Sequence, residues 1–182
     1  KNQQKKKKFV NSNYQILNSI KGLQNSEFDK HYLKKFNKNI EYFINKYEKN
    51  IFYLYKFLIF RERGKIKFLI IYKEIYIKKK IVIRFIDFYG NYKFLPKLKN
   101  SIMNFFFNKN VEYLDFYYFG IPNKYLLDTG FKIKKKNSKN ILPNYFEPFL
   151  KKNININYAI RKGSLKDNHF LFKGDCDQER PN

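Results

Sequence analysis

The chain of 182 residues contains one cysteine, Cys176, so no internal disulfide can form. Its two histidines, His31 and His169, lie far apart and make no recognisable zinc pattern with Cys176. The seven glycines do not cluster, so there is no P-loop and no dinucleotide-binding motif, and no G-x-S-x-G turn presents a nucleophilic serine. The common metal, nucleotide and hydrolase motifs are therefore absent.

Long apolar runs are also absent. No stretch approaches the ~18 residues that a membrane-spanning helix needs, and the best candidate, residues 51–60, contains Lys56. The first residues lack the charged-then-apolar pattern of a signal peptide, and because the chain starts with Lys1 we expect a fragment of a longer protein. Together with the single cysteine, these features predict a cytoplasmic protein without a membrane span.

Positive charge dominates the sequence, with 39 Lys and Arg against 15 Asp and Glu and a net charge of +24. Such a charge is typical of proteins that bind nucleic acid or another polyanion. However, lysine outnumbers arginine 34 to 5, and the abundant Lys, Asn, Ile, Phe and Tyr all have A/T-rich codons. We therefore interpret most lysines as solvated surface spread over several faces. A basic domain that binds nucleic acid is the alternative.

The length fits one domain, which we place at residues 26–182 after a polar, mobile lead-in over residues 1–25. A helical pattern covers residues 26–49, with Asn39 as a cap. Its apolar stripe consists of Ile40, Phe43, Ile44 and Tyr47.

After residue 49 the apolar residues recur with a period of two, as in a strand. Residues 52–60 and 66–72 flank a polar link with glycine and predict a β-hairpin. Residues 80–88 are apolar on both faces except at two charged positions, which predicts a central strand. A helix with Pro96 near its start and Asn110 at its end leads to a strand over residues 111–117.

This strand–helix–strand unit implies a parallel pair with a right-handed crossover. A short helix from Pro122 to Gly130 follows. Short strands are then expected at residues 131–135, 153–160 and 170–173. The predicted fold class is α/β, as an α+β mixed sheet with a central parallel strand pair and flanking helices.

Three local features could support chemistry. Asp87 ends the central strand, where open α/β sheets bind ligands and the next loop offers N–H groups to an anion, but it could also cap a turn or pair with Arg84 or a lysine. Asp115 shares a strand face with tyrosines and is either a general base or a structural carboxylate. The acids of the tail, residues 174–182, could hold a metal, a cationic amine substrate or the protein's own basic surface. We expect the tail to fold back near the carboxyl ends of the central strands.

At these residues the chain resembles the GNAT acyltransferase superfamily. Residues 125–131, Tyr-Leu-Leu-Asp-Thr-Gly-Phe, are similar to the "leucine, then Gly-Phe" end of the helix after the fifth strand of that fold. Residues 115–117, 141–149 and 175–182 resemble a poorly characterised bacterial group of GNAT-like proteins that ends in Asp-Gln-Asp-Arg-Pro-Asn-like segments. Where acetyl-coenzyme A-binding members carry a glycine-rich pyrophosphate loop, residues 88–94 contain one glycine.

The resemblance implies transfer of an acyl group from acetyl-CoA or another acyl-CoA to an amine, such as an amino sugar, by an active enzyme or a degenerate derivative. Asp115 or Glu147 would accept the amine proton, and Tyr117 would donate to the leaving thiolate. The implied cofactor-binding residues are Phe88, Gly90 and Asn91. The implied substrate-binding residues are Asp87, Asp175, Asp177 and Arg180, and Arg180 could donate to Asp115 or Asp87.

Overall fold

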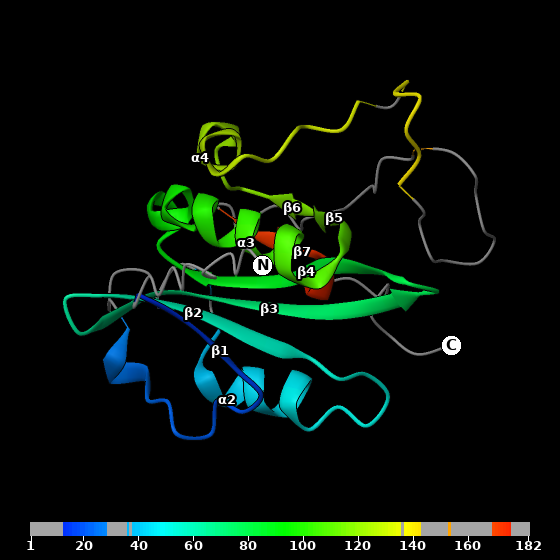
Figure 1. Ribbon diagram of the computed structural model, residues 1–182. Coiled ribbons are helices and arrows are strands. Elements are labelled where there is room, and N and C mark those ends of the chain that lie inside the picture. Colours follow the sequence, from blue (N-terminus) through cyan, green and yellow to red (C-terminus); the bar gives the residue numbers. More distant parts are fainter. Residues whose placement is uncertain are drawn as a thin grey trace, which may run out of the picture.

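The computed structural model describes residues 13–28, 36, 38–135, 137–142, 153 and 169–175. Its main feature is a five-stranded mixed sheet with helices on both faces (Figure 1). The sheet order β1-β2-β3-β4-β5 follows the chain. The strands are β1 (Tyr14–Leu17), β2 (Lys56–Glu62), β3 (Lys65–Ile77), β4 (Lys80–Gly90) and β5 (Val111–Phe116).

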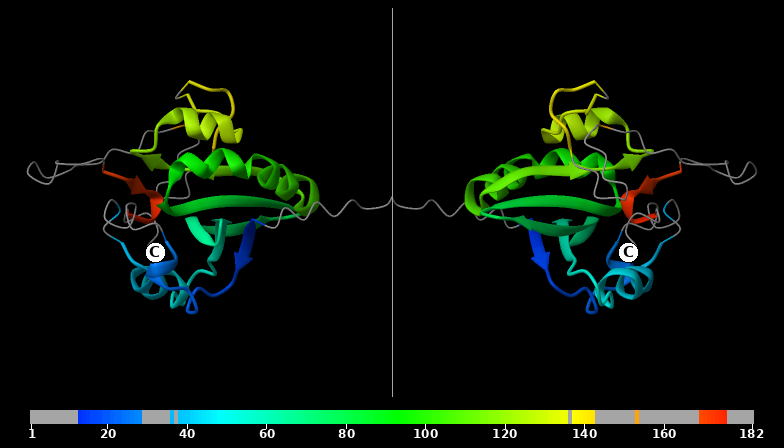
Figure 2. Two further views of the ribbon diagram at one scale, coloured as in Figure 1. Left: turned by 90° about the vertical axis from the view of Figure 1, so that its left-hand side faces the viewer. Right: turned by 90° about the vertical axis from the view of Figure 1, so that its right-hand side faces the viewer.

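Helices form a layer on each side of the sheet (Figures 1 and 2). On one side, α2 (Ile40–Phe43) continues directly into a π-helical turn, η2 (Ile44–Glu48). On the other side lie α3 (Lys99–Lys109), which follows the 3-10 helix η3 (Tyr92–Leu98), and α4 (Asn123–Thr129). The mixed α/β architecture expected from the sequence is therefore present.

The β2–β3 hairpin turns at Arg63 and Gly64, both of which have positive φ, as a two-residue hairpin turn requires. β3 and β4 pair antiparallel, and a register shift between Ile71 and Tyr72 marks a β-bulge. β4 and β5 pair parallel, which confirms the predicted parallel pair. The pair is not central as predicted, because β5 is an edge strand of the described sheet.

Side-chain chemistry explains the helix ends. The Asn39 side chain accepts a hydrogen bond from the Tyr42 amide, 2.7 Å away, which confirms the predicted cap. Ile40, Phe43 and Tyr47 of the predicted stripe are buried. Gly130 ends α4 in the left-handed conformation, as expected for a glycine at that position.

Several segments differ from the prediction. Within the pattern predicted as helical over residues 26–49, Asn25–Glu27 form a separate 3-10 turn and the helix capped by Asn39 covers Ile40–Glu48. The strand predicted from residue 52 begins only at Lys56, and residues 51–55 are irregular. Residues 14–17, placed in the polar lead-in, form β1, because they align with Phe57–Phe60 and extend the sheet beyond β2. Residues 131–135, predicted as a strand, are irregular, and Ile133 is exposed without a strand partner among the described residues. The strand expected at residues 153–160 lies outside the described residues except for Asn153.

The last described segment returns to the sheet. β7 (Leu171–Phe172) pairs antiparallel with β6 (Tyr118–Phe119), directly after β5. The 3-10 turn η4 (Lys173–Asp175) follows and lies against β4. The first residues of the predicted acidic tail, Gly174 and Asp175, therefore lie against β4, whereas residues 176–182 lie outside the described residues.

Candidate functional site

The two parallel strands separate near their carboxyl ends. Their pairing stops at Phe85 and Phe116, while β4 continues to Gly90. The ring of Phe172 contacts both sides of this opening. Its centroid lies 5.7 Å from that of Phe116, with nearly parallel planes, and 6.1 Å from that of Phe88. An aromatic side chain from β7 therefore fills the space between the strands.

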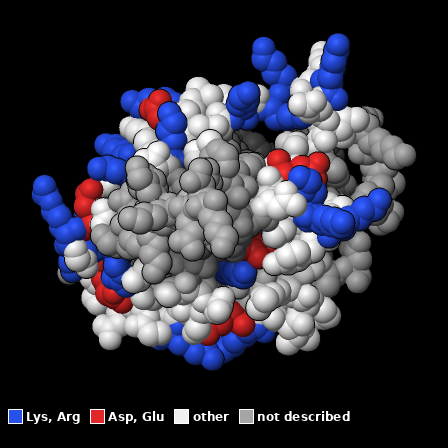
Figure 3. Space-filling view, viewed as in Figure 1, with Lys and Arg blue, Asp and Glu red and all other residues white. Residues whose placement is uncertain are grey.

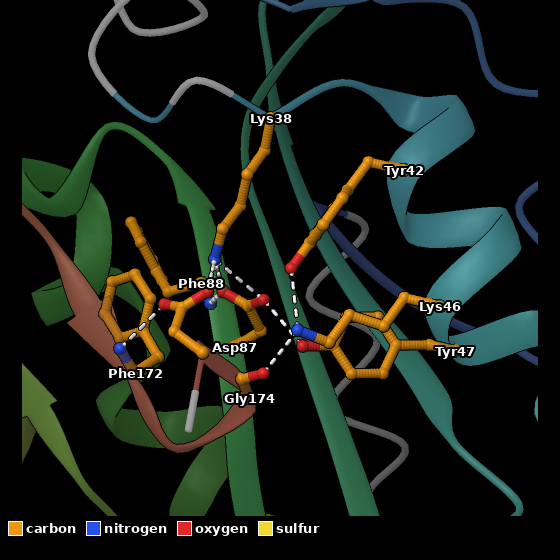
Figure 4. Close-up of polar contacts among 9 residues, drawn as sticks. Lys38, Tyr42, Lys46, Tyr47, Asp87, Phe88, Phe172 and Gly174 are labelled. Carbon is orange, nitrogen blue, oxygen red and sulfur yellow. Dashed lines mark hydrogen bonds and ion pairs between the residues drawn. The ribbon is translucent and has the colours of Figure 1, made fainter. Parts of the chain in front are cut away.

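Beside this opening, a group of polar side chains surrounds Asp87; we call it the Asp87 cluster (Figure 4). The Asp87 carboxylate is fully buried and accepts hydrogen bonds from the Tyr47 hydroxyl at 2.7 Å and from the Phe88 amide at 2.8 Å. The Lys38 ammonium donates to both carboxylate oxygens, at 2.7 and 2.9 Å. The cluster comprises Lys38, Tyr42, Lys46, Tyr47, Asp87 and Asp175.

A second carboxylate, that of Asp175, reaches the same ammonium. One Asp175 oxygen lies 2.8 Å from Lys38 Nζ, and the other accepts a hydrogen bond from the Phe172 amide at 2.9 Å. The rings of Tyr42 and Phe172 lie 5.6 and 5.3 Å from the same nitrogen, within cation–π range. The Lys38 side chain is only 9% exposed. Two carboxylates and two aromatic rings thus enclose one ammonium.

Burial and neighbouring charges in the cluster raise the pKa values of Tyr42, Tyr47 and Asp87. Burial raises the pKa of Asp87, and the neighbouring Asp175 adds to this, while Lys38 and Tyr47 oppose it. Burial and the charge of Asp87 also raise the pKa values of Tyr42 and Tyr47. Both tyrosines therefore remain hydrogen-bond donors at neutral pH.

The helical segment positions three members of the cluster. Tyr42 and Lys46 are four residues apart, and Lys46 Nζ donates to the Tyr42 hydroxyl at 2.8 Å. Lys46 also donates to the Gly174 carbonyl, which ties the helix to η4. The π-helical turn carries Lys46 and Tyr47, and such turns occur frequently at functional sites.

Asp115 belongs to a different group of residues. It lies opposite Arg84 in the β4–β5 register, and the Arg84 guanidinium donates to both Asp115 oxygens at 2.6 to 3.0 Å. Both side chains are at most 3% exposed. Burial and the charge of Asp115 raise the pKa of nearby Tyr117, whose ring lies 5.7 Å from Lys173 Nζ.

The implied cofactor residues mainly serve the protein's own packing. A Cβ at Gly90, where φ is +120°, would collide with the Lys67 carbonyl on β3. Asn91 caps its own helix: its side chain accepts from the Lys93 amide at 3.0 Å, and its carbonyl accepts from the Phe94 amide at 3.1 Å. The amides of Lys93 and Phe94 are therefore engaged within the chain.

The structure brings together two of the predicted site residues, Asp87 and Asp175, and separates them from the Arg84–Asp115 pair. Glu147, Asp177 and Arg180 lie outside the described residues. Of the two carboxylates proposed as partners of Arg180, Asp115 contacts Arg84, and Asp87 contacts Lys38 and Tyr47. Sequence reasoning missed Lys38, Tyr42, Lys46 and Tyr47. Only the four-residue spacing of Tyr42 and Lys46 could have indicated a shared helix face.

Within the described ranges, no group of three or more His, Cys, Asp or Glu side chains is arranged to hold a metal ion. None of the described helices has both the length and the apolar character needed to cross a membrane. Comparisons with protein families, curated proteins and solved structures found no match.

Proposed function

We propose that the chain is a GNAT-like N-acyltransferase, or a derivative of one, and that the Asp87 cluster recognises the primary amine of the acceptor. One observation carries this proposal: Asp87 and Asp175 converge on a single ammonium, at 2.7 and 2.8 Å, between the rings of Tyr42 and Phe172. Carboxylates and aromatic faces are the groups that bind a cationic amine. In this structure the bound ammonium is that of Lys38.

The cluster also has the chemistry to activate an amine. A protonated amine is not nucleophilic, so an acyl acceptor must first lose a proton to a base. Asp87 has a raised pKa because it is buried, and it is therefore a stronger base than an exposed aspartate. Tyr47, held neutral by the same burial, keeps Asp87 oriented through its 2.7 Å hydrogen bond.

An acceptor would have to take the place of the Lys38 ammonium. Removing that ammonium should therefore create a site that accepts a small primary amine. We expect Lys38→Ala to be destabilised, because two nearby carboxylates lose their shared cation. Ethylammonium chloride should restore its melting temperature in a saturable manner, whereas tetramethylammonium chloride, which cannot donate hydrogen bonds, should not.

Two control variants make this test specific. Lys97→Ala removes an exposed lysine that lies 3.5 Å from Glu62, and its melting temperature should not respond to ethylammonium. Lys38→Ala/Asp87→Asn lacks the buried negative charge and should also lose the response. Equal stabilisation of all variants by both salts would show only a general salt effect and would overturn the amine site.

Catalysis is tested separately. In the structure the amides of Lys93 and Phe94 donate to Asn91, and Phe172 fills the strand opening, so an acyl donor would have to compete with these contacts. Thiol release from acetyl-CoA should therefore be measured with a panel of amino sugars. Amine-dependent release that is lost in Asp87→Asn would support the transferase. Amine rescue of Lys38→Ala without any thiol release would instead indicate a derivative that only binds amines.

The net charge of +24 favours nucleic-acid binding as a second candidate function. On the face shown in Figure 3, Lys and Arg side chains lie in several separate places, often beside Asp or Glu, rather than along one groove. We therefore expect duplex binding to be weak. Tight binding whose affinity falls steeply with salt would favour this candidate over the transferase.

A further inference from the structure

The loop between η2 and β2 exposes three apolar side chains. Ile51 is 86% exposed, Phe52 63% and Leu54 78%; we call residues 50–55 the apolar loop. Ile51 and Leu54 are the two most exposed large apolar side chains of the described surface, and Phe52 lies between them in the sequence. A group of exposed apolar side chains of this kind is typical of an interaction site. In Figure 1 the loop projects below the sheet at the lower right.

The apolar loop is held in this conformation. The Asn50 side chain accepts hydrogen bonds from the amides of Phe52, at 3.0 Å, and Tyr53, at 2.8 Å. Tyr55 is buried, and its ring packs 5.0 Å from that of Tyr47. The intervening Tyr53 contacts Tyr55 at 6.1 Å. Because its base is anchored in the core, the loop presents its apolar side chains outward on a stable support.

One lysine lies directly beside the apolar loop, and three more follow at the turn after the same strand. The Lys73 ammonium lies 4.2 Å from the Tyr53 ring, which places β3 beside the loop. Farther along, Tyr76, Ile77 and the three lysines 78–80 are exposed at the β3–β4 turn. The nearby carboxylate of Glu74 is 5% exposed and paired with Lys56 at 2.9 Å.

We propose that the apolar loop and the adjoining lysines bind the surface of a bilayer that contains anionic lipid. A protruding apolar tip suits insertion between lipid headgroups, whereas binding to a folded protein would require a matching groove on that partner. Lysines around the tip would contact the phosphate groups of the lipids.

The absence of tryptophan from the chain allows a direct test. Phe52→Trp places a single fluorophore at the tip. Its emission should shift to shorter wavelength on addition of phosphatidylcholine vesicles containing phosphatidylglycerol, because the indole leaves water. Pure phosphatidylcholine should produce a smaller shift, and high salt should reduce the effect. An unchanged emission spectrum with bound vesicles would show that the tip does not insert and would overturn the proposal.

Vesicle flotation with a matched pair of variants completes the test. Ile51→Ser/Phe52→Ser/Leu54→Ser should weaken binding at least about tenfold, because apolar insertion is lost. The control Met103→Ser/Leu127→Ser removes exposed apolar side chains of α3 and α4 and should bind as the wild type does. Equal binding by all three proteins would contradict the proposal. Vesicle-independent dimerisation that the triple variant abolishes would instead assign the loop to a second copy of the chain.

Discussion

Arg84 and Asp115 lie opposite each other in neighbouring parallel strands, and the guanidinium donates to both oxygens of the carboxylate. The sequence offered two roles for Asp115, a general base or a structural partner. A carboxylate held by a bidentate, buried arginine already has its strong donors in place. The geometry therefore favours a structural role that fixes β5 against β4.

Breaking this pair should destabilise the fold strongly. Arg84→Met or Asp115→Asn alone leaves one buried charge without its partner, and each should lower the free energy of unfolding by about 3–5 kcal/mol. The double variant Arg84→Met/Asp115→Leu should lose much less unfolding free energy than the two single variants lose together. Urea denaturation measures all three. The exposed pair Lys97–Glu62 is the control, since Glu62→Gln should cost less than about 1 kcal/mol. If Asp115→Asn unfolds like the wild type, Asp115 is available as a base.

A pH profile tests the environment of Asp87. Its pKa in the folded chain is raised above the ordinary 3.8, so the native state binds this proton more tightly than the unfolded state does. Stability from this group is therefore present at low pH and is lost as the pH rises from about 3.8 through the raised pKa. Asp87→Asn, which stays neutral, should gain stability relative to the wild type over that range, by about 1.4 kcal/mol for each unit by which the pKa is raised.

The measurement is urea denaturation of both proteins at a series of pH values. Asp87→Asn also removes one partner of Lys38, which shifts the free energy of unfolding at every pH. The test is therefore how the difference in unfolding free energy between the two proteins changes with pH, and not its size at one pH. Asp128→Asn, on the exposed surface of α4, is the matched control. If the difference in unfolding free energy between wild type and Asp87→Asn stays constant across the acid range, burial does not raise the pKa of this carboxylate.

Local patterns were sufficient to predict much of the fold. The cap at Asn39, the helix end at Gly130 and the parallel pair each follow from residues close in sequence, and the structure contains all three. β1 was missed because its four residues carry only a weak alternation, and it is the pairing with β2 that orders them. Tertiary contacts of this kind cannot be read from a short segment.

Only two of the six residues of the candidate site were predicted, for the same reason. Asp87 was singled out because it ends a predicted strand, and Asp175 because it belongs to an acidic tail in a lysine-rich chain; the structure joins them through Lys38. Lys38 itself is one of 34 lysines, and nothing in its local sequence distinguishes it. Phe172 likewise gains its role only because β7 returns to the opening between β4 and β5.

Phe172 provides a test of how firmly the last described segment is bound. Its side chain is buried between Phe88 and Phe116, so Phe172→Ala should leave a cavity and cost about 3–5 kcal/mol of unfolding free energy. Phe52→Ala makes the same chemical change at an exposed position and should be nearly neutral. Near-wild-type stability of Phe172→Ala would mean that this segment is easily displaced and that the strand opening can admit a ligand.

Substitution of Gly90 distinguishes two explanations for this glycine, packing against β3 and close approach of a ligand. The resemblance to acyltransferases implies a glycine where the chain approaches a cofactor, whereas in the structure a Cβ at this position would meet the Lys67 carbonyl and lie 2.7 Å from Phe68 Cα. Its φ of +120° adds strain for any other residue. Gly90→Ala should therefore lower the free energy of unfolding by at least about 1–3 kcal/mol in the absence of any ligand.

Gly22→Ala is the matched control, because a Cβ there has no atom within 4 Å, and thermal unfolding of the two variants should differ clearly. Added acetyl-CoA separates the two roles further. A packing role predicts that Gly90→Ala is destabilised equally with and without acetyl-CoA. If Gly90→Ala instead unfolds like the wild type and loses only a stabilisation that acetyl-CoA gives to the wild type, then close approach of the cofactor, and not of β3, explains why glycine occupies the end of β4.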